Sequence, residues 1–149
     1  MSIFNRILCP IDFDGNSLDA LRLARRIAER DKATLYVLHV VPPQDPLVMS
    51  AQAITQRDEE YARRELQKVS NVELTGVDHE VLLRFGHPAT EIVAAETEAK
   101  AELLVMATHG RTGVSHFILG SVAEKVVRES ACPVLTVRMK TNHQPSKSN

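Results

Sequence analysis

A stretch rich in glycine and hydroxyl residues, late in the chain, has the residue types that bind an anion. After the apolar run 103–105, residues 106–127 read M-A-T-H-G-R-T-G-V-S-H-F-I-L-G-S-V-A-E-K-V-V. Gly120 has no Cβ, so the backbone there can approach a ligand closely. Ser121 can cap a following helix with its hydroxyl, and the first amides of a helix attract phosphate. The order of these residues therefore indicates a phosphate site at the start of a helix.

Residues upstream of this point could fold back over the same anion. They are Gly110 and Gly113, whose backbone is free of side-chain bulk, and Arg111, which carries a positive charge. The same spacing also fits an ordinary left-handed turn at Gly110 followed by a capped helix at Ser121. Short glycine motifs do not decide between these interpretations, so both stay open on spacing alone.

Asp12 is a second polar candidate, because it directly follows an apolar run near the start of the chain. Its carboxylate could contact a ligand. Alternatively, it could accept backbone N–H groups in the turn before the first helix, as aspartate often does near helix caps. The sequence leaves both roles open.

Alternating apolar patterns predict the elements that position these residues. Apolar or alternating runs predict strands at 3–11, 34–41, 77–85, 103–106 and 133–137. Helical periodicity predicts a first helix after the 14–17 cap cluster, with Asp19 in its first turn, and a second over 47–69 with Tyr61 in its apolar stripe. A third helix begins at Pro88, and a fourth, over 121–129, turns Val122, Val126 and Val127 inward.

Five strands alternating with helices indicate an α/β fold, a doubly wound parallel sheet with helices on both faces. In such sheets ligands bind beyond the carboxyl ends of the strands, where Asp12 and the 106–121 loop both lie. The pattern alone does not give the strand order.

Composition bounds the class of protein. A chain of 149 residues with 44% hydrophobic and 25% charged residues suits one domain, expected over 1–139, with a disordered polar tail at 140–149. The net charge of -1 gives no pull toward nucleic acid or an anionic membrane. No membrane span or signal peptide is expected, so a cytoplasmic location with Cys9 and Cys132 as buried thiols is predicted.

Several other classes of site lack their motifs. The first strand is not followed by G-x-G-x-x-G, no G-x-x-x-x-G-K-[ST] is present, and the third and fifth strands lack the terminal Asp and Lys of a receiver domain. Ser121 is not in a G-x-S-x-G elbow, and the histidines show no metal-ligand spacing. We therefore expect neither catalytic residues nor metal ligands.

These residues together resemble the universal stress protein family, in its ATP-binding subgroup. The family signature is Gly, two residues, Gly, nine residues, Gly, then Ser or Thr, and Ala107, Gly110, Gly120 and Ser121 stand at that spacing. Matching segments cover nearly the whole chain before the tail. They are R-I-L-C-P-I-D at 6–12, L-H-V at 38–40, G-H-P at 86–88, G-S-V-A-E-K-V at 120–126 and C-P-V-L at 132–135.

The resemblance implies a sheet of order 3-2-1-4-5, of the adenine nucleotide alpha-hydrolase-like kind, and a homodimer through the fifth strand, from Pro133 to Val137. It also implies bound ATP, ADP or AMP, with or without Mg²⁺. Asp12 would bind the ribose hydroxyls, Val40 would meet adenine with its backbone, and 110–113 would wrap the phosphates. The full set of implied contacts is Pro10, Ile11, Asp12, Val40, Met106, Ala107, Gly110, Arg111, Thr112, Gly113, Gly120, Ser121, Val122 and Ala123.

Two positions depart from the family pattern. Ala107 stands where the first glycine is expected, and a positive φ there would cost alanine about 1 kcal/mol. Ile11 replaces a residue that often carries a hydroxyl. We therefore expect a nucleotide-dependent stress-response dimer, read by an unknown protein partner, with at most slow ATP hydrolysis. The alternative is a scaffold dimer of the same fold without a nucleotide, and nothing dedicated supports an enzyme acting on another phosphorylated molecule.

Overall fold

The computed structural model describes residues 1–43, 51–109 and 119–138, with side chains from 56 onward in the second of these ranges. Its centre is a five-stranded parallel sheet of order β3-β2-β1-β4-β5. The strands are β1 (Arg6–Pro10), β2 (Thr34–Val41), β3 (His79–Phe85), β4 (Leu103–Ala107) and β5 (Val134–Val137). Strand order 3-2-1-4-5 and the doubly wound α/β class are therefore confirmed.

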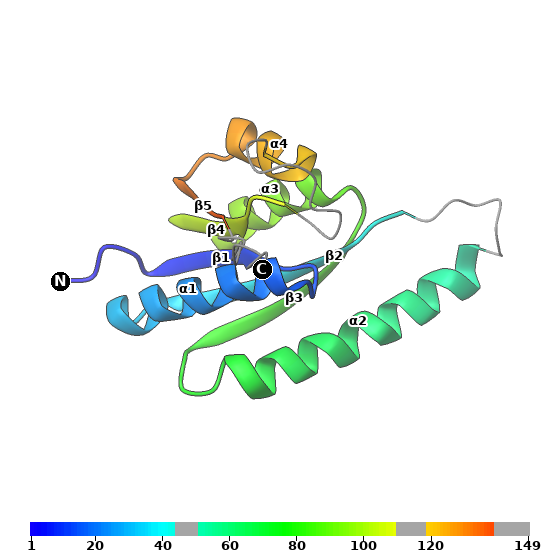
Figure 1. Cartoon of the computed structure of the whole chain (residues 1–149), viewed down its shortest axis with the longest axis horizontal. Coiled ribbons are helices and arrows are strands. Elements are labelled where there is room, and N and C mark those ends of the chain that lie inside the picture. Colours follow the sequence, from blue (N-terminus) through cyan, green and yellow to red (C-terminus); the bar gives the residue numbers. More distant parts are fainter. Residues whose placement is uncertain (44–50, 110–118, 139–149) are drawn as a thin grey trace, which may run out of the picture.

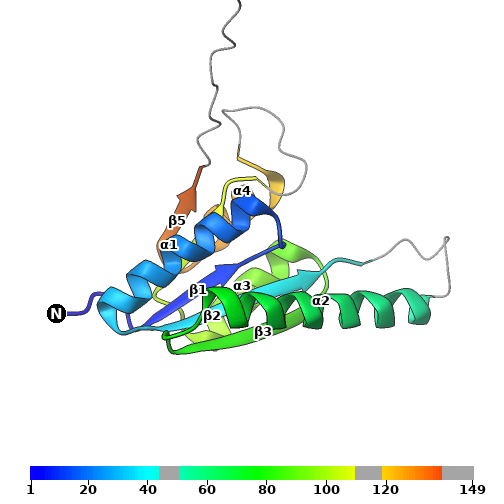
Figure 2. The ribbon, with the colours of Figure 1, turned by 60° about the horizontal axis from the view of Figure 1, so that its bottom comes forward.

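Four described helices cover the sheet, two on each face (Figures 1 and 2). They are α1 (Gly15–Asp31), α2 (Ala51–Glu73), α3 (Pro88–Ala99) and α4 (Ser121–Glu129). In Figure 2, α1 and α2 lie in front of the sheet and α3 lies behind it. Both views show the N-terminal half of α2 running past the ends of the strands.

Two apolar clusters hold the layers together, one on each face. The front cluster joins Ile7, Cys9 and Val105 to Leu21 and Ala24 of α1. The back cluster consists of Leu8, Leu38, Val40, Leu104 and Met106 of the sheet with Ala89, Ile92, Ala95, Ala123 and Val126 of the helices. Strands β1, β2 and β4 supply residues to both clusters because successive side chains point to opposite faces. Buried on both sides, these strands show the continuous apolar runs that the sequence displays.

The element limits match the sequence predictions closely, with local corrections. The ranges 34–41 and 121–129 are confirmed, whereas β1 and β3 are shorter than 3–11 and 77–85. Asp19 is not in the first turn of α1, because that helix already begins at Gly15. The start of the predicted 47–69 helix and the 140–149 tail lie partly or wholly outside the described residues.

Three side chains predicted to be inside are more exposed than expected. Tyr61 of α2 is 46% exposed and Val127 of α4 is 44% exposed. Adjacent residues of a helix point in different directions. Because Val126 faces the core, Val127 points away from it. Cys9 is fully buried but Cys132 only half-buried, and burial raises the pKa of both thiols. Burial thus disfavours the reactive thiolate form at both positions.

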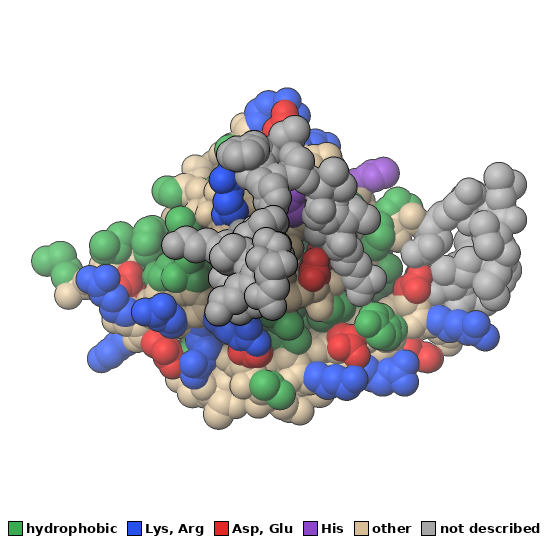
Figure 3. All heavy atoms as spheres, viewed as in Figure 1, with side chains coloured by type: hydrophobic (Ala, Val, Ile, Leu, Met, Phe, Trp, Pro, Cys, Tyr) green, Lys and Arg blue, Asp and Glu red, His purple; other side chains and the backbone are tan. Residues whose placement is uncertain are grey.

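No helix in the described part of the chain is long and apolar enough to cross a bilayer. Over α1 and α2, Figure 3 shows basic and acidic side chains interleaved on the visible face. Several of these form ion pairs, including Arg22 with Asp19 and Arg63 with Glu59. Interleaved charges of this kind are typical of a solvated helix face.

Glu96 of α3 is a buried carboxyl group, only 3% exposed, that fixes the connection from α4 to β5. Its Oε1 accepts the backbone N–H groups of Ala131 and Cys132 at 2.8 and 3.0 Å. Its Oε2 accepts the Ser130 hydroxyl at 2.7 Å. One side chain of α3 thus satisfies the donors of a loop more than thirty residues away, since a buried donor left unpaired is costly.

We predict that Glu96→Ala lowers the free energy of unfolding by about 1–3 kcal/mol, because the N–H groups of Ala131 and Cys132 and the Ser130 hydroxyl lose a charged, buried acceptor. Urea unfolding followed by circular dichroism measures the change. Glu98→Ala is the matched control on the same helix, since Glu98 is exposed and its ion pair in the described part of the chain is with Arg84. Equal losses for the two variants would contradict the role assigned to Glu96.

Candidate functional site

The end of β4 and the start of α4 are joined directly by a backbone hydrogen bond. The Gly120 N–H donates to the Thr108 carbonyl at 2.8 Å. Thr108 in turn donates its own N–H to Val137 of β5 at 3.1 Å. The tip of α4 is therefore held at the carboxyl edge of the sheet, the edge at which ligands bind in this fold class.

Gly120 is required for close approach rather than for an unusual backbone. Its φ of −59° is open to any residue. A Cβ built at Gly120 would lie 3.1 Å from the Thr108 carbonyl oxygen, tighter than ordinary contact. A side chain there would press on the chain's own backbone, so a Gly120 variant would perturb the fold together with any ligand site.

Ser121 does not cap α4, contrary to the prediction from the sequence. Gly120 is the N-cap residue, and no side-chain hydrogen bond caps the helix. Ser121 occupies the first helical position with its side chain exposed. Its hydroxyl is displaced from the cap because α4 begins at Ser121 itself, one residue earlier than a cap at Ser121 would require.

The first amides of α4 are the donors that this arrangement offers. The Glu124 N–H is bonded to the Gly120 carbonyl at 2.9 Å, closing the first helical turn. The amides of Ser121, Val122 and Ala123 have no acceptor among the described residues. Such amides, at the positive end of the helix dipole, suit an anion such as phosphate.

Ala107 lies in extended backbone as the last residue of β4, paired with Val137 of β5. It is not among the described residues with positive φ, which are Phe13, Lys32 and Lys100 outside the glycines. Ala107 therefore does not incur the free-energy cost that a positive φ would impose on alanine. For a ligand at this edge, what distinguishes Ala107 from glycine is the volume of its methyl group.

The end of β1 contributes the second part of the candidate site. Pro10 ends the strand, and Ile11 is buried, with its N–H donating to the Leu38 carbonyl at 2.7 Å. Because β1 pairs with β4, Asp12 and Thr108 follow adjacent strands at the same edge of the sheet. Strands β2 and β3 lie on one side of β1, and β4 and β5 lie on the other. The direction of winding therefore reverses between β1 and β4, and the switch point of the sheet lies at this edge.

One carboxylate oxygen of Asp12 accepts a backbone N–H group in the turn before α1, one of the two roles that the sequence left open. Its Oδ1 accepts the Asp14 N–H at 3.0 Å, and its own N–H donates to the Ser17 hydroxyl at 3.2 Å. Oδ2 has no hydrogen-bond partner within 1–43, 51–109 and 119–138. A carboxylate with one oxygen fixed and one available is oriented for a hydroxyl donor.

Two apolar residues line the back face at the same edge. Val40 of β2 and Met106 of β4 are buried in the cluster formed with α3 and α4. Strands β2 and β4 flank β1, so both residues lie near the carboxyl end of β1, at Pro10. A planar apolar group such as a nucleobase fits a wall of this kind.

Some predicted contacts lie outside the described residues, and others were not anticipated. Gly110, Arg111, Thr112 and Gly113 are in the undescribed part, so the structure says nothing of them. The sequence analysis missed Thr108, whose carbonyl anchors α4, and Phe13, which has a φ of 66°. No sequence signal marks either, because a carbonyl is common to all residues and a bulky residue at positive φ is uncommon.

Within the described ranges, no three His, Cys, Asp or Glu side chains gather as a metal site. His109 is adjacent to the site, and its Nδ1 is 2.9 Å from the Thr108 hydroxyl. The contact pairs a hydroxyl with an imidazole, but Thr108 is only 7% exposed, so the pair is buried at the strand end.

Comparisons with known proteins agree with this geometry. The chain matches the model of the Universal stress protein family over residues 3–138. It is 35% identical to Universal stress protein MJ0531 of Methanocaldococcus jannaschii over 142 residues, covering 92% of this chain and 84% of the relative.

Two solved structures are similar throughout. Protein MJ0577 has a TM-score of 0.84 and 26% identity, covering 93% of this chain and 99% of the other. A universal stress protein in complex with cAMP has a TM-score of 0.71 and 26% identity, covering 93% of this chain and 100% of the other.

We predict that Ala107→Gly destabilises the protein by about 0.5–1 kcal/mol, because glycine in a strand loses more backbone entropy and gains no relief of strain. Urea unfolding of the variant and the parent measures this difference. An increase in stability would mean that Ala107 is strained in its strand position.

Proposed function

Because the chain belongs to the universal stress protein family, we propose that it binds an adenine nucleotide and acts as a cytoplasmic, nucleotide-dependent regulatory dimer in a stress response. Residues 1–139 would form its single domain. One observation carries the proposal: the first amides of α4, which have no acceptor among the described residues, are tied by the Gly120 to Thr108 bond to the strand edge that also bears Asp12.

The phosphates would lie at the tip of α4. The amides of Ser121, Val122 and Ala123 would donate to phosphate oxygens, and the exposed Ser121 hydroxyl adds another donor. The helix dipole favours negative charge at the same point. Gly110, Arg111, Thr112 and Gly113 belong to this proposal from the sequence pattern.

The nucleoside would extend from the phosphates toward β1 and β2. Asp12 would accept a ribose hydroxyl with Oδ2, because Oδ1 already holds the Asp14 N–H. Adenine would lie by Val40 and Met106, meeting the backbone at Val40. Buried Ile11 offers no polar side chain at this point, so the sugar contact rests on Asp12.

The arrangement favours binding over chemistry. Mg²⁺, when it accompanies ATP, would neutralise phosphate charge, and the described residues supply no cluster of three carboxylate or histidine ligands to hold it on its own. The Thr108 hydroxyl, which contacts the His109 imidazole at the strand edge, belongs to a residue only 7% exposed and is no open nucleophile. We therefore expect at most slow hydrolysis, so that ATP, ADP or AMP would act as a signal read by another protein.

The competing function is a scaffold dimer of the same fold without a nucleotide. Its support is the Ala107 methyl group at the phosphate edge. The extended backbone at Ala107 removes the conformational argument for it and leaves only the bulk of one methyl group. The family relative in complex with cAMP shows that a related protein of this fold accepts an adenine nucleotide.

We predict that freshly purified protein releases adenine nucleotide on denaturation, or binds Mg-ATP in titration calorimetry. Asp12→Asn should weaken ATP binding about tenfold or more, because a hydrogen bond to a charged acceptor is lost. Asp14→Asn is the matched control. Asp14 lies in the same turn and makes no side-chain cap bond, so its variant should bind ATP as the parent does.

The outcome separates the two functions. A protein that carries no nucleotide and ignores ATP, ADP and AMP in calorimetry is the scaffold dimer. If Asp12→Asn and Asp14→Asn bind ATP equally well, Asp12 does not hold the ribose.

We also propose a homodimer formed through β5, from Pro133 to Val137. β5 lies at the edge of the sheet and pairs only with β4 in the described chain. Leu135 on this strand is 37% exposed, and Val127 of the neighbouring α4 is exposed as well. An edge strand with apolar side chains needs a cover, and a second β5 would supply it.

We predict that Leu135→Lys weakens dimerisation by at least about tenfold, because a charge enters an apolar contact. Sedimentation velocity over a concentration series measures the dimer dissociation constant. Val81→Lys is the control, since Val81 is similarly exposed on β3, at the opposite edge. A dimer that resists the first change but not the second forms through β3 instead.

A further inference from the structure

The two residues on either side of Asp12, Ile11 and Phe13, both contact His39. The Ile11 carbonyl accepts a hydrogen bond from Nδ1 of His39 at 2.8 Å. The ring of Phe13 lies against the same imidazole, with centroids 4.3 Å apart and planes tilted by 32°. His39 therefore contacts the residue before Asp12 and the residue after it.

Phe13 is held in a conformation that it would not adopt unaided. Its φ is 66°, in the left-handed region, where a bulky side chain is disfavoured. Such a residue persists only where its surroundings hold it, and these cases are concentrated at functional sites. Besides His39, the Phe13 ring meets Tyr61 of α2 edge to face, at 6.3 Å and 89°.

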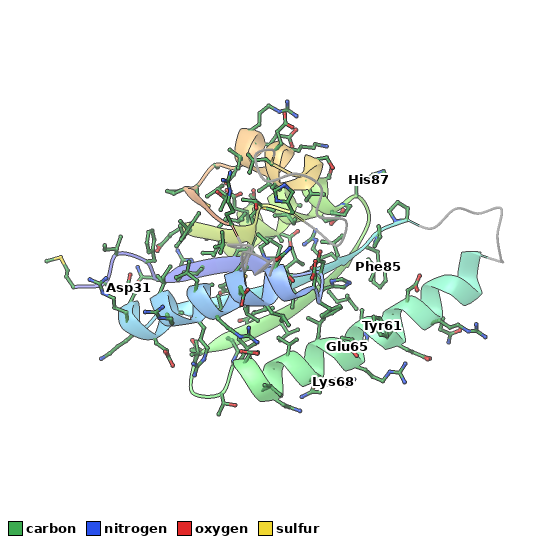
Figure 4. All side chains as sticks on the ribbon, in the orientation of Figure 1. Asp31, Tyr61, Glu65, Lys68, Phe85 and His87 are labelled. Atoms are coloured by element: carbon green, nitrogen blue, oxygen red, sulfur yellow. The ribbon has the colours of Figure 1, made fainter. Side chains whose placement is uncertain are left out.

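These aromatic contacts lie on the face of the sheet opposite the proposed adenine wall. Val40 belongs to the back cluster, and neighbouring residues of a strand point to opposite faces, so His39 points to the front. Tyr61 reaches the same region from α2, which lies in front of the sheet (Figures 2 and 4). His39 thus contacts the residues on either side of Asp12 from the front face, whereas the proposed adenine wall is on the back face.

We propose that His39 is a positioning residue for the ribose-binding carboxylate. Because a carbonyl only accepts, the Nδ1 of His39 must carry a proton and donate it to the Ile11 carbonyl. That bond fixes the residue before Asp12, and the stacked ring keeps Phe13 left-handed after it. The Asp12 carboxylate is then oriented with Oδ1 on the Asp14 N–H and Oδ2 toward a sugar hydroxyl. This inference rests on the proposed nucleotide function.

If His39 had a purely structural role, its variants would change nucleotide binding differently. Loss of packing alone would weaken binding of every nucleotide, or lower stability, without changing the preference for a ribose hydroxyl. The ratio of the dissociation constants for 2′,3′-dideoxy-ATP and ATP therefore separates the two roles, because dideoxy-ATP cannot donate to Asp12. We expect this ratio to be about tenfold or more in the parent protein.

The His39 variants differ in whether their side chain can donate a hydrogen bond to the Ile11 carbonyl. His39→Leu removes the donor and should cut the ratio at least about fivefold, toward the value for Asp12→Asn. His39→Asn places an amide N–H near the Nδ1 position and should keep the ratio within about twofold, whereas His39→Gln places it farther out and should not. This pair decides the matter even if His39→Leu does not fold.

His79 provides a matched control. Its Nδ1 also contacts a backbone carbonyl, that of Val77, at 2.8 Å, but at the start of β3 and the opposite edge of the sheet. His79→Leu should therefore leave the ratio unchanged. An equal fall in the ratio for His79→Leu and His39→Leu would overturn the proposal.

A nucleotide-free measurement keeps the two proposals distinguishable. Amide exchange at Asp14, whose N–H donates to Asp12 Oδ1, should be at least about fivefold faster in His39→Leu or His39→Gln and unchanged in His79→Leu. If the parent binds ATP but the ratio survives in these His39 variants, the positioning role is wrong and the nucleotide function stands. If the parent binds no nucleotide, the nucleotide function fails, and unaltered Asp14 exchange overturns the positioning role as well.

Discussion

The hydrogen bond from the Gly120 N–H to the Thr108 carbonyl is the constraint on which the site depends. It fixes the first turn of α4 against the end of β4, which itself pairs with β1. Without that bond the first amides of α4 would have no defined place relative to Asp12. Gly120 is needed for this reason, since a Cβ would lie 3.1 Å from the same carbonyl oxygen. The glycine therefore serves the fold first, and the proposed ligand would use the arrangement that the fold creates.

The sequence predicted the elements well because the apolar periods agree with their local structure. The 34–41 strand and the 121–129 helix match the observed limits, and the α/β class followed from alternation. The strand order came only through resemblance, since every parallel order buries similar apolar runs. Ser121 was placed one residue out of register, because Gly120 and Ser121 are both acceptable caps and only the local backbone decides between them. The left-handed Phe13 had no signal, because its conformation comes from His39 and Tyr61, which are distant in sequence.

The two faces of the sheet have separate tasks. On the back face, Val40 and Met106 pack with α3 and α4 and border the proposed nucleotide. On the front face, the rings of His39, Phe13 and Tyr61 connect the loop after β1 to α2. Asp12 lies where these two sides meet. A change in the loop that carries this carboxylate would therefore reach α2 through aromatic contacts, on the face opposite the proposed nucleotide.

The carboxyl group of Glu96 has a consequence for how two copies would meet. By accepting the amides of Ala131 and Cys132, it immobilises the residues that lead into β5 before any second molecule arrives. Segments that order only on contact lose conformational freedom at that moment, which slows productive encounters and weakens the complex. Here the freedom is already lost when the monomer folds. The exposed edge is a preorganised template, and its association would behave as rigid docking rather than as folding coupled to binding.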